Sequence, residues 1–497
     1  MRLPIAVALL CASVPLCLSA SVVQCPDGTP PPCRTAAAAP APRSVAVLNF
    51  RLLSRDSSDA YLAEGLADAI TTRLSQVERL EVASRTAARL GRTPRAAYVV
   101  SGTMLRQNAQ LVVNVELART STGRNAWAQR YERPDTAVLA LESDIALAVA
   151  TNMLPSVTPA ERTALGGSPT VRADAYDHLM RGNFLLARRS LANVGRAIQE
   201  YEAAARLDPA LASAPARIGL ASALWLDYAW DPAGRPAPDS VLAKGIAATT
   251  RALAIDSTSS DAWLSKAYLG MWANPRTFEG VEDAFRRAIA LDPRNAEAHH
   301  QYGDFLGVVA RTDESIAELR RALALDPARA VTLRNLGSTL DTAGGMVMLD
   351  SAIQLEPDNF MGWINRAFLR AELRDTAGAR ADAERARRVV TPEMELIAAG
   401  QAGQLYLVIG DSAAAWHELQ RALQLLAPSG PVSTRSSPVG QLLYLLGRQD
   451  DALDFLDRIA PRGAILWFAI MGTRTDLSRL PPRAARVLEE ARPPWVH

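Results

Sequence analysis

Few residues in this 497-residue chain have the types and spacings that catalysis or metal binding requires. Five histidines are present, and His299 and His300 form the only adjacent pair. Adjacent positions on a helix point about 100° apart, so this pair makes a poor metal site. The neighbouring carboxylates Asp450 and Asp451 are typical of a solvated helix end. Neither pair predicts an acid–base or metal centre.

Sequence motifs for nucleotide binding and nucleophilic catalysis are missing too. No G-x-x-x-x-G-K, G-x-G-x-x-G, G-x-S-x-G or H-E-x-x-H string occurs. Lys244 and Lys266 are the only lysines among 54 basic residues, which leaves few candidates for chemistry that needs a lysine. We therefore expect no catalytic residue, no metal site and no cofactor. An unrecognised enzyme is the alternative, and it would need carboxylates or histidines clustered in a deep cleft.

Composition limits the choice of partner. The chain is 49% hydrophobic and 21% charged, so it can bury a large core, and its length allows two to four domains. The net charge of +2 is close to neutral, which argues against general binding of polyanions. We expect protein or peptide partners and no nucleic acid.

One sequence motif, called the phrase below, repeats along the chain and defines the repeat units of most of it. It stands at Tyr201–Pro209, Phe285–Pro293 and Leu319–Pro327, and the last two copies begin 34 residues apart. This is the period of tetratricopeptide repeats, each of which is a pair of antiparallel helices. We expect about eight degenerate repeats over residues 171–476. An unrelated helical solenoid is the alternative, and the Ala-and-Pro frame of the phrase disfavours it.

The repeat pattern also explains which residues recur. Small side chains, such as Gly303, Ala267 and Ala367, are expected where two helices cross closely. Proline then ends each unit, because a residue that precedes proline is disfavoured in the helical region. Stacked pairs form a superhelix whose inner face is lined by the first helix of each pair.

That inner face predicts a groove for a partner. The Lys and Asn residues of a tetratricopeptide carboxylate clamp are missing, so we expect an amphipathic helix or an extended peptide instead. Ordinary variation on an unused surface is the alternative for each position. The expected groove residues are Leu264, Tyr268, Met271, His300, Asp304, Ile364, Asn365 and Phe368.

A compact α/β unit is predicted over residues 44–155, before the repeats. Short apolar runs and an alternating stretch indicate five strands, and two helices with apolar faces are expected to cover one side of the sheet. The expected strands are Ser44–Phe50, Leu80–Ser84, Ala97–Arg106, Ala109–Arg119 and Asn125–Tyr131. The fold class is therefore mostly α, with a small α/β domain followed by an α-helical superhelix.

This unit resembles the amino-terminal domain of TolB-like proteins. The matching pieces are Ser44–Phe50, Tyr61–Leu66, Tyr98–Thr103 and Trp127–Tyr131. In that family the domain often stands between a cytoplasmic signalling domain and a tetratricopeptide array. Here a targeting segment takes the place of the kinase, cyclase or winged-helix part. The stretch after Arg85 is also shorter than the family's usual helix.

The first 43 residues predict export. Residues 1–21 have an early arginine, an apolar stretch and small residues for cleavage, as in a signal peptide. An uncleaved anchor in the inner membrane is the alternative. Residues 22–43 are a Pro/Ala-rich linker, in which Cys25 and Cys33 could form a disulfide in an oxidising compartment. We expect a periplasmic or secreted protein.

Two further segments complete the predicted organisation. Residues 156–170 are expected to be a linker, and residues 477–497 a capping helix and tail. The function that fits is an exported, non-enzymatic interaction scaffold, with the TolB-like domain as a second interaction module. The alternative is a regulatory protein whose TolB-like domain senses a small molecule or peptide. A polar pocket at the strand ends would favour that alternative.

Overall fold

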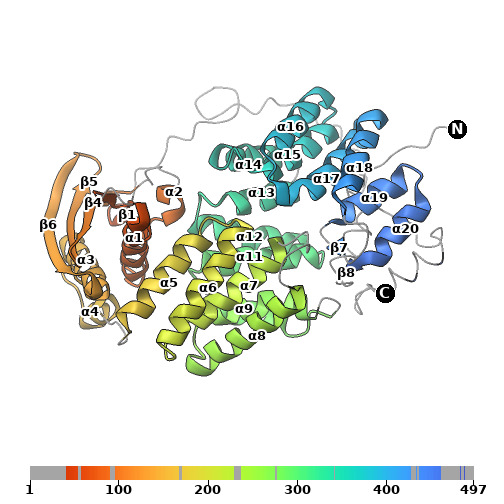
Figure 1. Cartoon of the computed structure of the whole chain (residues 1–497). Helices are drawn as coiled ribbons and strands as arrows, with labels where there is room; N and C mark the ends of the chain where they lie inside the picture. Colours follow the sequence, from red (N-terminus) through yellow and green to blue (C-terminus); the bar gives the residue numbers. More distant parts are fainter. Residues whose placement is uncertain are drawn as a thin grey trace.

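The chain has a small α/β unit at one end and helices throughout the rest (Figure 1). It is mostly α, as expected. The computed structural model describes residues 41–53, 57–89, 96–166, 171–228, 237–274, 277–340, 342–426, 432–433, 436–460, 482 and 486. The predicted signal peptide, Cys25 and Cys33, and almost all of the predicted capping segment lie outside these residues.

The α/β unit, called the sheet domain below, contains a mixed sheet with the strand order β3-β1-β4-β5-β6. β1, β3 and β4 are parallel, and β4, β5 and β6 form an antiparallel meander. The sequence prediction missed β2, which pairs with β4. The strands are β1 (Ser44–Val47), β2 (Arg51–Leu52), β3 (Glu81–Val82), β4 (Tyr98–Gln107), β5 (Gln110–Arg119) and β6 (Arg124–Pro134).

The turn between β4 and β5 lies one residue later than the sequence suggests. Asn108 and Ala109 have φ angles of 52° and 60°, so both are left-handed. Two successive left-handed residues are the signature of the tight hairpin turn that matches the twist of its strands. Gln107 and Gln110 close this turn as the last pair of the ladder.

Two helices, α1 (Ala60–Ser75) and α3 (Val138–Met153), cover one face of the sheet. The apolar faces predicted for them are buried, from Leu66 and Ile70 in α1 to Leu141 and Ile145 in α3. Alternate residues of β5 meet them from the sheet side. Asp135–Met153 is the one stretch of the described residues long and apolar enough to cross a membrane, and its inward side chains belong to this core.

Eight consecutive helix pairs follow within the described residues, and they form a curved array (Figure 1). The helices are α5 (Ala173–Leu186), α6 (Leu191–Leu207), α7 (Ser213–Tyr228), α8 (Pro238–Ile255), α9 (Ser260–Ala273), α10 (Val281–Leu291), α11 (Ala296–Val308), α12 (Thr312–Leu325), α13 (Ala330–Thr339), α14 (Thr342–Leu355), α15 (Phe360–Glu372), α16 (Thr376–Val389), α17 (Glu395–Val408), α18 (Ser412–Leu425), α19 (Ser437–Leu445) and α20 (Gln449–Arg458).

The helices of a pair cross where the sequence places small residues. A Cβ atom on Gly303 of α11 would lie 2.9 Å from Cγ of Leu319 in α12, closer than real contacts allow. Ala267 and Ala367 are fully buried at the corresponding positions. Large side chains such as Tyr201 and Phe285 fill the space beside these crossings and are fully buried. Each such side chain contributes about 1.5–3 kcal/mol through burial.

The predicted linker at 156–170 contains a helix. Residues Pro159–Gly166 form α4, and its Leu165 is fully buried in the core of the sheet domain. Arg79 fixes α4 from outside through hydrogen bonds to Glu161 at 2.8 and 2.6 Å. This part of the segment therefore belongs to the sheet domain, and the linker interpretation is wrong for it. The sequence did not predict this helix because only one of its residues, Leu165, is buried, so it has no apolar period.

The first helix of the array, α5, completes the sheet domain. Its Met180 is buried in the sheet-domain core, and a Cβ atom on Gly65 would come within 3.0 Å of the Met180 sulfur. Tyr176 of α5 donates a hydrogen bond to the buried Glu142 of α3 at 2.8 Å. Arg73 of α1 lies 3.7 Å from the same carboxylate. We call this meeting of α1, α3 and α5 the seam.

Candidate binding chamber between the sheet domain and the helix pairs

A cavity of about 1730 Å³ lies between the sheet domain and the concave side of the array. We call it the chamber. α1 and the short helix α2 (Arg85–Arg89) of the sheet domain form one wall. The turn between α5 and α6 and residues of α7, α11 and α13 form the opposite walls, and the segments around Glu356 and Glu393 form the far end. Both parts of the chain therefore line one space.

The sheet domain presents the carboxyl ends of its parallel strands toward this space. Arg85 follows β3 and donates to the carbonyl oxygen of Val47, at the end of β1, at 2.8 Å. It also donates to Asn49 at 2.6 Å and to Asp68 at 2.8 Å. Carboxyl ends of parallel strands are where α/β proteins commonly bind ligands. Arg85 fills the strand ends themselves, so the open space lies beyond it, in the chamber.

A first arginine cluster joins the sheet domain to the array. Arg85 and Arg89 pair with Asp68, and Arg89 also pairs with Glu64 at 3.2 Å. Arg188, from the turn after α5, reaches Glu64 from the array side at 3.2 Å. This cluster holds three arginines and two carboxylates, so it keeps one net positive charge at the chamber wall.

A second cluster lies beside it on the array. Glu297, near the start of α11, accepts hydrogen bonds from Arg189 and from Arg329, the latter at 2.5 Å. Gln301 donates to its other oxygen at 2.9 Å. Burial opposes the charge of Glu297, but the two guanidiniums outweigh it and hold its pKa well below the usual range. Two arginines against one carboxylate again leave one positive charge.

A further contact, called the Asp326 clasp, holds the start of α2 to the array. Asp326 of the α12–α13 loop accepts hydrogen bonds from Ser84 at 2.7 Å and from Thr86 at 2.5 Å. Asp292 ends the same phrase one repeat earlier, and its carboxylate caps its own loop at the amide of Arg294. The Asp326 side chain has instead been recruited by the sheet domain. Arg294 adds a hydrogen bond to the carbonyl oxygen of Ser75 at 2.6 Å.

The two adjacent histidines point in different directions, as expected. His299 bonds Glu318 at 2.6 Å, and this bond raises its pKa. His300 lines the chamber and bonds the Thr332 hydroxyl at 3.0 Å. Burial and the nearby Arg329 hold the pKa of His300 well below its usual value, so it is neutral. The pair does not converge on one site.

The predicted groove residues divide into two groups. Tyr268, His300, Asp304 and Asn365 line the chamber, and Tyr268 is also buried in the core of α5–α11. The other four belong to helix-pair cores: Leu264, Met271 and Ile364 are buried, and Phe368 is half-buried against the core of α15–α20. Core packing explains why these four are apolar. A role in partner binding stays a prediction for the first group.

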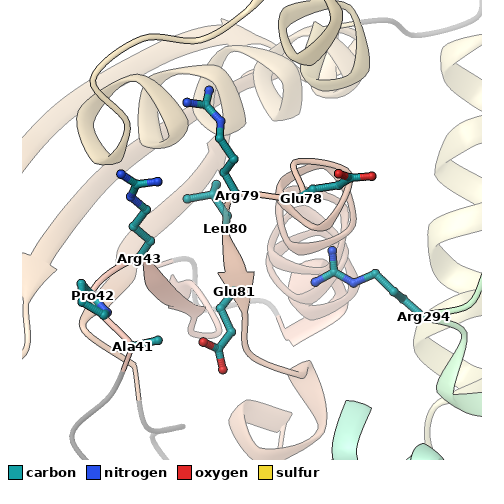
Figure 2. Close-up of a pocket in the computed structure, with 8 residues that line it drawn as sticks. All are labelled: Ala41, Pro42, Arg43, Glu78, Arg79, Leu80, Glu81 and Arg294. Carbon is teal, nitrogen blue, oxygen red and sulfur yellow. The ribbon is translucent and has the colours of Figure 1, made fainter.

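A smaller cavity of about 760 Å³ lies at the amino ends of β1 and β3 (Figure 2). Arg43, Glu78 and Glu81 line it from the sheet domain, and Arg294 reaches in from the array. This is a polar pocket at strand ends, but at the ends opposite to those that usually bind ligands. Across the described residues, no group of three or more His, Cys, Asp or Glu side chains could hold a metal ion.

Comparisons with known proteins cover parts of the chain. No protein-family model matches it. Putative adenylate cyclase 3 of Rhizobium meliloti is 27% identical over 192 residues, which are 36% of this chain and 33% of that protein. The chain thus spans about a third of that relative's length.

Two of the solved structures to which the chain is similar cover more than half of it. A tetratricopeptide repeat protein from Parabacteroides merdae covers 55% of this chain and 98% of its own, with a TM-score of 0.36 and 14% identity. Human IFIT1 with m7Gppp-AAAA covers 65% of this chain and 80% of its own, with a TM-score of 0.45 and 14% identity. The assignment rests on this chain's own helix pairs, spacing and Asp-Pro ends. These pairs form a tetratricopeptide-type array.

Proposed function

We propose that this protein is an exported, non-enzymatic interaction protein that binds a segment of a partner protein in the chamber. The observation that carries this proposal is that the sheet domain and the tetratricopeptide array line the same cavity. The sheet domain would then act as a second interaction module, because it supplies one wall. The resemblance of that domain to TolB-like proteins is consistent with this role.

The contacts between the two parts support a fixed chamber. The buried seam and the Asp326 clasp hold the sheet domain at two separate places. A preformed site loses less conformational freedom on binding than a loose one, so it binds its partner more tightly. The volume also exceeds the roughly 300–1,000 Å³ of small-molecule pockets, which favours a polymer segment as the occupant.

Blocking the chamber tests this function. Ser338 is exposed on α13 and lines the chamber. Its hydroxyl accepts a hydrogen bond from Asn365 at 2.8 Å and donates to the carbonyl oxygen four residues earlier. Thr250 on α8 makes the same backbone bond at an exposed position that does not line the chamber. Ser338→Trp places a bulky side chain in the chamber, and Thr250→Trp is the control for introducing such a side chain at an exposed helix position.

We expect cross-linked co-purification from the native host to recover specific partners with the original protein and with Thr250→Trp. Ser338→Trp should lose them. Recovery of the same partners by all three proteins would contradict the proposal, because the chamber would then not be the binding element.

The segment at residues 1–21 supports export, which places the partner in the periplasm or outside the cell. Sequencing the amino terminus of the protein from its host tests this. A mature chain that starts near Ser21 agrees with cleavage, whereas an intact Met1 favours an inner-membrane anchor.

Ligand sensing by the sheet domain is the second candidate, and the polar cavity in Figure 2 is the observation that favours it. A ligand there would lie beside Arg294, whose bond to Ser75 joins the array to α1. Arg43→Ala should then abolish ligand-dependent changes in partner binding. Partner binding that never depends on a small molecule would remove this candidate.

A further inference from the structure

The chamber has two walls of opposite charge. Its lining between Asp68 and Thr339 contains seven arginines and four carboxylates. Its lining between Leu355 and Met394 contains three carboxylates and no basic residue. The arginines come from the sheet domain and from the helix pairs up to α13, and the carboxylates Glu356, Asp358 and Glu393 come from the segments that follow α14 and α16.

The positive wall keeps a small excess of arginines over carboxylates. Its seven arginines face six carboxylates once Glu64 and Asp261, which pair with them from outside the lining, are counted. The cluster of Arg85, Arg89 and Arg188 has one arginine more than it has carboxylates, and so has the cluster around Glu297. The consecutive residues Arg188 and Arg189 join the two clusters. Their side chains keep 42% and 29% of their surface exposed, so a ligand can contact both.

We propose that the chamber binds an extended, acidic polypeptide segment, with its carboxylate side chains on the arginine wall formed by both domains. This inference rests on the proposed function and names the chemistry of the partner. Guanidiniums suit carboxylates because they donate two parallel hydrogen bonds in one plane. The sheet domain contributes to selection through Arg89, which shares the carboxylate of Glu64 with Arg188 of the array.

The far wall favours a peptide over a nucleic acid. A nucleic acid carries negative charge along its whole length, and the carboxylates Glu356, Asp358 and Glu393 would repel it. A peptide can be acidic at one end and neutral or basic at the other, so it matches both walls. Opposite potentials of this kind fix the direction in which a segment binds.

Removing two arginines tests the proposal while Glu64 and Glu297 each keep one arginine partner. In Arg188→Gln/Arg189→Gln, Glu64 keeps Arg89 and Glu297 keeps Arg329. The matched control is Arg130→Gln/Arg133→Gln, which changes the net charge equally on the exposed edge strand β6. Arg89→Gln tests the sheet-domain wall separately, because Asp68 keeps Arg85 and Glu64 keeps Arg188.

The measurement is binding of the full chain to an array of random 12-residue peptides, followed by titration of the best binders. We expect these binders to carry net negative charge in one half and to weaken as salt rises. Arg188→Gln/Arg189→Gln should weaken them by about tenfold, Arg89→Gln by a smaller factor, and the control not at all.

Four outcomes would overturn the acidic-segment proposal. Best binders that are neutral or basic would refute the charge selection alone and leave the chamber as a peptide site. Displacement of the peptides by inorganic phosphate at constant ionic strength, or tighter binding of an oligoribonucleotide, would assign the arginine wall to another anion. If no peptide binds, the proposed function fails together with this inference.

Discussion

Two glutamates, one in the seam and one in the chamber wall, are both largely removed from water by burial. Their pKa values nevertheless shift in opposite directions. Glu142 in the seam is fully buried, and its pKa rises to about 7 because burial disfavours the charged form. Glu297 in the chamber wall is also largely buried, yet its pKa falls well below the usual range. The sequence around each residue gives no reason for this difference.

The difference lies in how many arginines reach each carboxylate. Arg73 approaches Glu142 only to 3.7 Å, and a tyrosine hydroxyl supplies its close contacts. Two guanidiniums and an amide bond Glu297 directly. Opposite charge at hydrogen-bond distance offsets desolvation, whereas a neutral donor offsets little of it. The seam is therefore built to hold a neutral carboxyl, and the wall to hold a charge.

The largest effect is expected from removing the charge in the wall. Glu297→Gln leaves Arg189 and Arg329 facing a neutral amide, and losing one partner of a buried ion pair costs about 3–5 kcal/mol. Both arginines border the open chamber and can regain water, so we expect a loss of about 3 kcal/mol in local unfolding free energy. Hydrogen exchange of α11 and α13 measures it.

Glu132→Gln is the control for this change, because Glu132 is 62% exposed on β6. A loss no larger than the control's would show that the two arginines do not depend on Glu297. The arginine wall would then be held by other contacts.

In the seam, the corresponding substitution of Glu142 by glutamine should raise stability, whereas Glu297→Gln lowers it. The pKa of Glu142 is raised from 4.5 to about 7. Between these values the folded state keeps a proton that the unfolded state has released, so stability falls as pH rises through this range. The shift corresponds to an upper limit of about 3 kcal/mol at pH 8.

Glu142→Gln removes this pH-dependent loss. The amide loses its attraction to Arg73, so we expect the variant to be about 1–2 kcal/mol more stable than the original protein at pH 8. The two proteins should be nearly equal near pH 4.5. Thermal unfolding and hydrogen exchange of α3 and α5 across this pH range measure the difference. A variant that is less stable at pH 8 would show that Glu142 is charged and needed in the seam.

The same contrast explains how far the sequence could predict the structure. The array was predictable because each helix pair repeats the same local requirements. Gly303, for example, lies where two helices cross closely, and Pro327 follows the end of α12. The sequence marks such crossings and helix ends in the same way in other repeats. The apolar periods of α1 and α3 were equally local, and both helices cover the sheet as expected.

The chamber was not predictable from spacing. Arg189 and Glu297 are 108 residues apart, and Thr86 and Asp326 are 240 apart. Each contact depends on how far the array has curved, which no single repeat specifies. Leu264 was assigned to the groove as an inner-face position of the first helix of its repeat, but packing between helices buries it fully.

The smallest loss of stability is expected when the Tyr176 hydroxyl, which bonds Glu142 in the seam, is removed. Tyr176→Phe removes the hydrogen bond to Glu142 and leaves the aromatic packing in place. At pH 5.5 the acceptor is a neutral carboxyl, and the loss should be about 1 kcal/mol. At pH 8 the acceptor is charged in the original protein, so the loss should approach about 2 kcal/mol.

Tyr444→Phe, at an exposed position of α19, is the control. Hydrogen exchange should lose protection in α3 and α5 and keep it in α11 and α13. An equal loss at both pH values would mean that Glu142 does not change charge in this range, and the opposition between seam and wall would then fail.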